Sequence, residues 1–421
     1  MTGIGAVASP IAPSDAAAAL PHPSRRSLRA LDWFVFFVAD VQTGFGPFVA
    51  VYLTTQKWTQ VDIGLVLTVA GLVSLFGQVP GGALVDWARS ERVVAGVAIS
   101  VVGCCALAYA LWPIFPVVMI AAGLHAAASC VLGPAIAAIS LGLVGRERAG
   151  ERFGRNARFA SLGAGLAAMV MGGIGYVFTA QAVFFVTATL LIPALLALRA
   201  LVPSEIDPDR AHGDLPEQPP VRPPLDLRFL VRRRPLLIFG VCIMLFHLAN
   251  AAMLPFMGSL LTTRTAEWAT VLIGACMVGP QIIVALFSPW VGRRAERWGR
   301  RPLLIAAFAA LAVRGILFGM VSDPYMLVVV QLLDGLTAAV FAVLVPLTVA
   351  DLTYGTGRFN VTLGMVGMMM GMGASISPSL AGYVSEGFGF EWAFFSLASV
   401  AAVGFATVAL LMPETRRLRD G

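Results

Sequence analysis

Several ionisable side chains stand within long apolar stretches of this 421-residue sequence, where an uncompensated charge costs several kcal/mol. Each of them is therefore a candidate for function. Asp40 is the foremost, with Gln42 and Thr43 beside it. If the first apolar helix begins near Leu31, Asp40 lies nine residues into it. That depth is about 14 Å at about 1.5 Å per residue.

Three roles are open for Asp40. Burial in hydrocarbon favours the neutral form of a carboxylate, so this side chain could take up and release a proton. It could instead make a structural hydrogen bond between two helices, or contact a bound small molecule directly. Gln78 lies at a similar depth in the next apolar stretch, and we expect a contact between it and Asp40.

Arg314 and Asp334 lie at similar depths in two later stretches. A structural ion pair is the preferred interpretation, because a lone arginine there would have to extend its charge to the membrane surface. The alternative is that Asp334 is a second proton-carrying carboxylate.

Uncharged polar groups in apolar stretches supply candidates for a binding cavity. His125 and His247 could bind a substrate or take a proton, or each could simply bond to a backbone carbonyl. The candidate cavity residues are Gln42, Thr43, Gln78, His125, His247, Asn250 and Gln281. No metal site is predicted, because the five cysteines lack ligand spacing and the methionine-rich run 365–373 offers only thioethers.

Composition identifies the solvent of these stretches. The chain is 58% hydrophobic and 12% charged, whereas soluble domains carry about 25% charged residues. Apolar runs of about twenty residues, long enough to cross a bilayer, recur from Leu31 to Met412. Despite a pI of 9.4, the basic residues form no stripe with aromatics, so nucleic-acid binding is not expected.

The runs predict an all-α membrane protein of twelve transmembrane helices in two bundles of six. The expected spans are 31–54, 61–86, 92–112, 115–143, 155–179, 181–201, 235–262, 269–292, 301–321, 325–350, 358–385 and 390–412. The expected parts are a disordered tail (1–28), a first bundle (29–201), a proline-rich linker (202–234), a second bundle (235–412) and a final tail (413–421).

The basic residues predict the orientation. Of the 29 lysines and arginines, 26 fall on the side of the N-terminus. Two, Lys57 and Arg264, fall on the other side, and Arg314 lies within a helix. Because basic loops stay in the cytoplasm, we expect both termini, the linker and both tails to be cytoplasmic in a bacterial inner membrane.

The two halves repeat one another. A shift of about 210 residues brings Pro47-Phe48 onto Pro255-Phe256, Gly82 onto Gly292 and Asp86 onto Glu296. It also brings Gly175-Tyr176-Val177 onto Gly382-Tyr383-Val384. The order of the matches and the nearly constant shift indicate that both halves have the same helix order.

The loop expected at 292–301, GRRAERWGRR, resembles the signature G-x-x-x-D-R-x-G-R-R of the major facilitator superfamily. Glu296 stands where that pattern has aspartate. The equivalent loop of the first half keeps Gly82 and Asp86 but departs at Trp87 and Arg89. The resulting candidate cytoplasmic gate motif comprises Gly82, Asp86, Arg92, Gly292, Glu296, Arg297, Gly299, Arg300 and Arg301. In such a motif glycine permits close helix approach, and the carboxylate can meet a helix N-terminus or an arginine of the other half.

The resemblance implies a cavity lined by helices 1, 4, 7 and 10, reached from one side of the membrane at a time. Antiporters of that family share a helix 5 motif ending G-P-x-x-G-G. The corresponding AMVMGG at 168–173 keeps both final glycines without the proline, so export is only weakly favoured. Met119 stands where the family commonly has an arginine in helix 4.

These observations favour a secondary transporter over an enzyme, because the sequence has no P-loop and no convincing catalytic constellation. We expect proton-coupled efflux of a small organic or amphipathic compound, with uptake of a small solute as the runner-up and a non-transporting receptor behind it. No cofactor is expected besides a proton gradient as the energy source. The expected partners are the lipid bilayer and a small-molecule substrate, with the chain acting as a monomer.

Overall fold

The computed structural model describes residues 23–43, 45, 47–214, 232–264 and 269–416. The helices of the first half are α1 (Arg25–Thr43), α2 (Pro47–Thr55), α3 (Gln60–Trp87), α4 (Glu91–Leu111), α5 (Phe115–Val144), α6 (Ala149–Val177) and α7 (Ala180–Ala200). A short helix α8 (Pro208–His212) follows. The second half contains α10 (Arg234–Asn250), α11 (Met253–Arg264), α12 (Ala269–Trp298), α13 (Arg301–Met320), α14 (Pro324–Leu352), α15 (Phe359–Phe388) and α16 (Phe390–Leu411).

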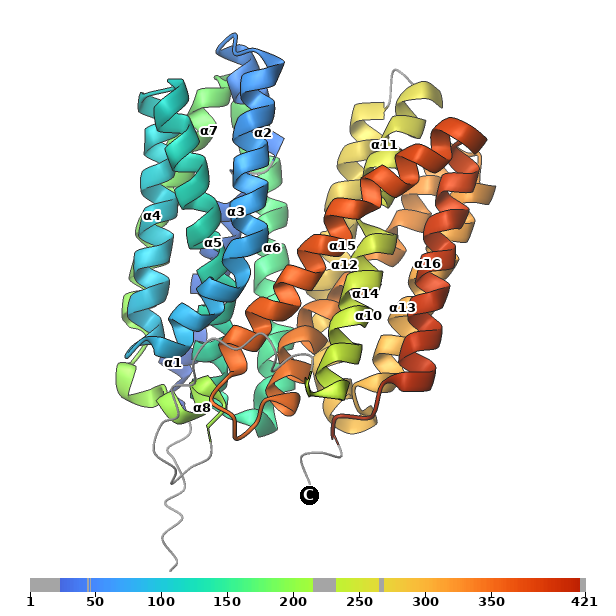
Figure 1. Cartoon of the computed structure of the whole chain (residues 1–421). Coiled ribbons are helices and arrows are strands. Elements are labelled where there is room, and N and C mark those ends of the chain that lie inside the picture. The colour runs from blue at the N-terminus through green and yellow to red at the C-terminus, as the bar shows by residue number, and fades with distance from the viewer. Residues whose placement is uncertain (1–22, 44, 46, 215–231, 265–268, 417–421) are drawn as a thin grey trace, which may run out of the picture.

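The predicted twelve-span, all-helical fold is confirmed. Within the described ranges, twelve helical segments are long and apolar enough to cross a membrane. The first, Arg25–Thr55, comprises α1 and α2, and the seventh, Arg234–Thr262, comprises α10 and most of α11. The two halves stand beside each other and diverge towards the ends of α2 and α11 (Figure 1).

Some predicted boundaries were wrong where charged residues lie in helices. α1 begins at Arg25, so residues 25–28 of the predicted disordered tail are helical. The backbone N–H of Ser27 donates to the hydroxyl of Ser24, which itself donates to Glu205. These bonds anchor the start of α1. The remainder of that tail, residues 1–22, lies outside the described residues.

Two helices extend into segments that were predicted as loops. α6 begins at Ala149 rather than near 155, because the charges in its first turns are paired in the interior. α12 continues to Trp298, so most of the predicted 292–301 loop is the last two turns of this helix. The predicted linker contains α8, while its residues 215–231 and the last residues of the final tail, 417–421, lie outside the described part of the chain.

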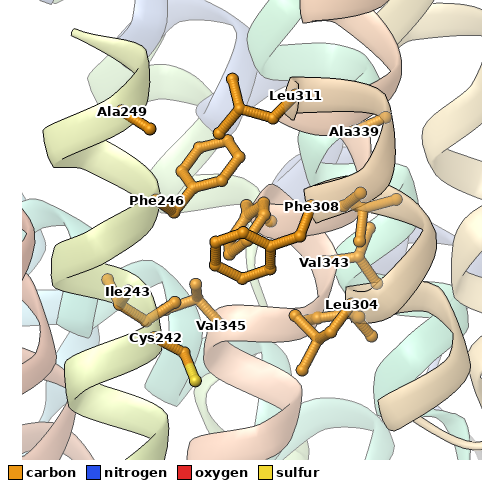
Figure 2. Close-up of a cluster of buried hydrophobic side chains, with 14 of the residues drawn as sticks. Cys242, Ile243, Phe246, Ala249, Leu304, Phe308, Leu311, Ala339, Val343 and Val345 are labelled. Carbon is orange, nitrogen blue, oxygen red and sulfur yellow. The ribbon is translucent and has the colours of Figure 1, made fainter. Parts of the chain in front are cut away.

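Each half has its own apolar core. In the second half, Phe246 of α10 stacks on Phe341 of α14 at a centroid distance of 3.7 Å. Phe308 of α13 meets both rings edge-on. Figure 2 shows Phe246 and Phe308 surrounded by aliphatic side chains of the same three helices. This packing makes the half a rigid unit that can position polar residues.

A buried polar network ties α1 to α6. The guanidinium of Arg152 donates to Asp32 at 2.6 Å and to Asn156 at 2.7 Å. Asn156 donates to Ser140 of α5 at 2.7 Å. Arg155 also pairs with Asp32 at 2.6 Å, but its side chain is 51% exposed, whereas that of Arg152 is 3% exposed.

We expect Arg152→Met to destabilise the protein far more than Arg155→Met. Removing Arg152 leaves the buried Asn156 oxygen without its donor and leaves Asp32 with only the half-exposed Arg155, at a cost of about 1–3 kcal/mol for each of the two groups. The matched change at the exposed Arg155 costs about 1 kcal/mol or less. Denaturant unfolding of the detergent-solubilised variants would measure both, and equal losses would contradict this account of the network.

Candidate functional site

The connections α3–α4, α5–α6, α12–α13 and α14–α15 lie with α8 at one end of the molecule, here called the linker end (Figure 1). At this end the two halves are in contact. The most extensive contacts are those of α3 with α15 and of α6 with α12, and the equivalent pairs α6 with α14 and α5 with α15 add smaller ones. The site is therefore built from two crossings related by the internal repeat.

Glycine allows the backbones to touch at both crossings. A Cβ on Gly82 would lie 2.1 Å from the carbonyl oxygen of Asn360, and one on Gly292 would lie 2.2 Å from that of Gly150. Both clashes would be with backbone, which cannot swing aside as a side chain can. The same residue offset, 210, relates Gly82 to Gly292 and Gly150 to Asn360.

A second glycine pair continues these contacts one turn further. A Cβ on Gly154 would lie 2.5 Å from the carbonyl oxygen of Ser288, and one on Gly364 would lie 2.1 Å from that of Gln78. These residues again differ by 210 in sequence number. The interface thus has a local two-fold pseudosymmetry.

One carboxylate of each half caps a helix of the other half. Asp86 accepts hydrogen bonds from the backbone N–H groups of Asn360 and Val361 at 3.2 and 2.7 Å, at the start of α15. Glu296 accepts from the N–H of Gly150 at 3.1 Å, at the start of α6. A carboxylate at a helix N-terminus satisfies free N–H groups and meets the positive end of the helix dipole.

An ion-pair cluster adds to the second crossing. Arg300 is 1% exposed and donates to Asp351 at 2.8 Å. Asp351 also lies 3.5 Å from Arg146 of the first half and accepts from Thr415 at 3.2 Å. The Arg300 guanidinium lies 3.5 Å from Glu296 as well. Asp351 therefore links both halves to the segment that follows α16.

Towards the opposite end the same helix faces have no close neighbours. Gly71 lies seven residues before Gln78 on α3, Gly172 lies seven after Gly165 on α6, and Gly274 lies seven before Gln281 on α12. Residues seven apart share a helix face. A Cβ on Gly71, Gly172 or Gly274 would meet no atom of the described residues within 4 Å. The contact between the halves is thus concentrated at the linker end, and the opposite end is open.

Asp40 lies in α1, fifteen residues from the start of the helix rather than the predicted nine. Its residue is 4% exposed, and its Oδ1 has no hydrogen-bond partner within the described structure. Among the described residues, no hydrogen bond joins Asp40 to Gln78. Gln78 instead donates to the Cys130 sulfur at 3.5 Å and packs on Gly364. Thr43 donates to its own helix at Ala39.

The expected pair of Arg314 and Asp334 is present, and it includes a third residue. The guanidinium of Arg314 donates to Asp334 and to the amide oxygen of Asn250. Arg314 is 1% exposed, while the Asp334 side chain is 24% exposed. Gln331 also lies 3.5 Å from Asp334. In α1 and α10 the repeat offset is 208, as for Pro47 and Pro255, so Asn250 is the counterpart of Gln42, and the counterpart of Asp40 is Leu248.

The two histidines have different surroundings. His125 stacks on Phe45 at 3.9 Å and lies 3.4 Å from the Ser129 hydroxyl. Nδ1 of His247 lies 3.0 Å from the carbonyl oxygen of Ile243, the bond that the simpler interpretation expected. Gln281 faces Gly165 across the crossing of α6 and α12. Within the described ranges, no group of three histidine, cysteine or acidic side chains could hold a metal ion.

Not every residue of the candidate gate motif reaches the other half. Arg92 donates to the carbonyl of Leu201 within the first half at 2.8 Å. Arg297 is exposed, and its carbonyl accepts from Arg416. Gly299 has a φ of 93° and packs against the Glu414 side chain. Glu414 also accepts a hydrogen bond from the backbone N–H of Arg301 at 3.1 Å. These residues order the connection within each half instead of joining the halves.

The segment from Pro203 to Asp214 bridges the halves, which sequence reasoning missed. The carbonyl of Ala211 accepts from Asn360 at 3.2 Å, and that of Gly213 accepts from the N–H of Gly355 at 2.7 Å. His212 lies 3.1 Å from Oε1 of Glu91, within ion-pair distance although not aligned as a hydrogen bond.

Burial opposes protonation of His212, but Glu91, Asp86 and Asp214 outweigh it, so its pKa is raised above the ordinary value. A protonated His212 thus links the linker to the carboxylate that caps α15. Proline and charge in the linker concealed this docking, because they are equally typical of exposed chain.

The repeat could have supplied one missed residue. Since Glu296 is the counterpart of Asp86, a helix start at Gly150 predicts its counterpart at Asn360. The repeat did not indicate the ion pair of Asp351 and Arg146, and the two residues are distant in sequence.

Comparison with known proteins identifies the fold. The family model of the Major Facilitator Superfamily matches residues 33–270 and 239–421. The chain is a member of the major facilitator superfamily. It is 38% identical over 392 residues to an uncharacterized MFS-type transporter of Mycobacterium tuberculosis, covering 93% of this chain and 94% of that protein. As a member, it is a membrane transporter and not an enzyme.

Another member is similar over a smaller part, and two solved structures share the fold over most of the chain. The class B tetracycline resistance protein of Escherichia coli is 30% identical over 139 residues, which cover 33% of this chain and 34% of that protein. The human organic anion transporter MFSD10 (TETRAN) has a TM-score of 0.70 at 16% identity, covering 92% of this chain and 100% of that one. The fucose:proton symporter FucP of E. coli gives the same TM-score at 14% identity, with 91% and 97% covered. At these identities the solved structures show a shared fold.

We expect Asp86→Asn and Glu296→Gln each to weaken closure at the linker end. Either change removes the charge that caps a helix of the other half, a loss of about 1 kcal/mol and so about a fivefold shift of the equilibrium. Spin labels on the exposed positions 89 and 293 would report the change as a longer distance between the halves.

Asp323→Asn is the matched control. Asp323 caps α14 within one half by accepting from Tyr325 and Met326. It should therefore leave the label distances unchanged. An equal effect in this control would show that the distance reports general loosening and not separation of the halves.

The stability that the docked linker segment adds through His212 should depend on pH. Because the pKa of His212 is raised on folding, its stabilisation is fully present below the ordinary value near 6.5 and is lost as pH rises through the raised value. We expect His212→Gln to lower the melting temperature at about pH 6 and to have little effect at about pH 9. A deficit that is the same at both pH values would contradict the role of the protonated ring.

Proposed function

We propose that this transporter is a proton-coupled exporter of a small organic or amphipathic compound. It works by alternating access in a bacterial inner membrane, with both termini and the linker end in the cytoplasm. The proton gradient supplies the energy. Family membership shows that the protein is a transporter, and we propose in addition its direction, its coupling to protons and its class of substrate.

The observation that carries proton coupling is the unpaired oxygen of Asp40. This residue is 4% exposed in a membrane-spanning helix, and Oδ1 has no hydrogen-bond partner within the described structure. An ionised carboxylate in such a place is costly, whereas the protonated form is tolerated. Opening of the site to water would favour release of the proton, and closure would favour its uptake.

The Arg314 cluster suits a fixed role better than a second coupling role. Asp334 already forms an ion pair with the buried guanidinium of Arg314, which also holds Asn250. We therefore assign coupling to Asp40 and assign the positioning of α10, α13 and α14 to the arginine cluster.

The interface supports alternating access. Contacts between the halves are concentrated at the linker end, and they use two equivalent crossings. Breaking the two carboxylate caps and re-forming contacts at the opposite end would rock one half against the other about the repeat axis. The basic residues at the linker end favour its placement in the cytoplasm.

The partial relatives favour export. They include tetracycline resistance proteins of E. coli and the multidrug resistance protein 2 of Bacillus subtilis, which is 26% identical over 133 residues, or 32% of this chain. Each similarity covers about a third of the chain. The substrate of this protein is proposed only as a class, small and amphipathic, because the candidate cavity groups are mostly neutral.

We expect Asp40→Asn to abolish transport driven by a proton gradient while exchange of substrate across the membrane without a gradient continues. The amide resembles the protonated carboxylate but cannot release a proton. Proteoliposomes with an acidic interior would be tested with a panel of amphipathic compounds that includes tetracycline. Loss of gradient-driven accumulation should be at least tenfold.

Asp62→Asn is the control, because Asp62 is a carboxylate at the start of α3 that is bonded to Thr59. It should transport like the unaltered protein. Gradient-driven transport by Asp40→Asn at the normal rate would rule out the coupling role. Export predicts that the interior becomes more alkaline as a substrate accumulates, whereas co-entry of substrate and proton would identify an importer. Binding without flux in the unaltered protein would identify a receptor.

A further inference from the structure

A pair of joined grooves lies on the outer surface of the first half, away from the crossings. One groove, of about 710 Å³, runs between α4 and α5 and is lined by Val97, Cys104, Ile120 and Leu124. The other, of about 380 Å³, runs between α4 and α7. They share Val93, Gly96 and Leu195. All three helices span the membrane, so these grooves face lipid.

The grooves are apolar, but two cations stand at one end. Arg92 and Arg199 line the smaller groove at the linker end of α4 and α7. Arg199 is exposed, and Arg92 is half-buried with one bond to the carbonyl of Leu201. Neither has a carboxylate within ion-pair distance in the described part of the chain. The nearby Glu91 is buried and turned to His212.

The dimensions match one leaflet of a bilayer. From Arg92 to Cys104 the α4 helix rises about 18 Å at about 1.5 Å per residue. One leaflet of hydrocarbon is about 15 Å deep. A lipid with its phosphate at the two arginines would therefore lay an acyl chain along the longer groove and end near the middle of the membrane.

We propose that this surface is a binding site for an anionic phospholipid of the leaflet on the linker side. The two arginines neutralise the phosphate and attract the net negative headgroup, and the joined grooves hold the chains. A zwitterionic lipid has the same chains but a balancing positive charge, so it binds more weakly. The site is separate from the crossings and does not depend on the proposed direction of transport.

The test is lipid titration of delipidated, purified protein, with melting temperature and native mass spectrometry as readouts. Phosphatidylglycerol should bind more tightly than phosphatidylcholine with the same chains. Arg92→Gln and Arg199→Gln together should remove this preference, with about a fivefold loss for each arginine. Arg25→Gln with Arg29→Gln removes two exposed arginines from α1 at the same end and should keep the preference.

Two further variants separate the parts of the site. Val97 is exposed, and Val97→Trp would fill the longer groove. This variant should weaken the binding of phosphatidylglycerol although both arginines are intact. Arg199→Gln alone tests the charge without breaking the Arg92 bond, should the double variant fold poorly. Equal binding of both lipids, or an unchanged preference in Arg199→Gln, would overturn the proposal. Equal stabilisation by glycerol phosphate would show an anion site that needs no acyl chain, which also overturns it.

Discussion

The structure depends on direct contact between helix backbones at two crossings. Where Gly82 meets Asn360 and Gly292 meets Gly150, no side chain fits between the helices. That closeness has an electrostatic consequence, because it brings the start of α15 within reach of Asp86 and the start of α6 within reach of Glu296. A bulkier residue at either glycine would separate the helix start from its cap. Packing and charge therefore act together, and closure at the linker end requires both.

The interactions within each half differ in kind from those between the halves. Each has an aromatic and aliphatic core, and the first half has a buried network about Arg152. Those interactions lie within one half, so the proposed rocking of one half against the other need not break them. The interface instead relies on a few hydrogen bonds at helix ends, which can be exchanged with water or with other partners. This division suits a protein that must move two bodies without unfolding either.

The repeat gives equivalent interfaces but different interiors. Asp40 of α1 has an unpaired oxygen and corresponds to Leu248 of α10, whereas Asn250 corresponds to Gln42 and is held by Arg314. At the place of Asp40 the second half therefore has an apolar residue and no carboxylate. The closing contacts in turn gain the additional Arg300–Asp351 cluster in the second half. The two halves thus share one helix arrangement but carry different polar residues.

Sequence alone determined what depends on local chemistry. Span length and apolar composition predicted the twelve helices, and the shift of 210 residues predicted two equivalent halves, because both are properties of contiguous segments. The capping carboxylates were among the predicted residues for the same reason, since the motif is local. The start of α6 was predicted too late, because its arginines are typical of an exposed loop. Only the structure shows that Arg152 is buried and paired with Asp32.

Tertiary structure alone decided which residues meet. Asp351 joins Arg146 across 205 residues, and His212 in the linker reaches Glu91 in α4. It joined Gln78 to Cys130 and Asn250 to Arg314. Periodicity gives the depth of a residue in the membrane, but not the rotation of its helix or the neighbour it faces. Those are set by the packing of whole helices, which is a property of the assembled fold.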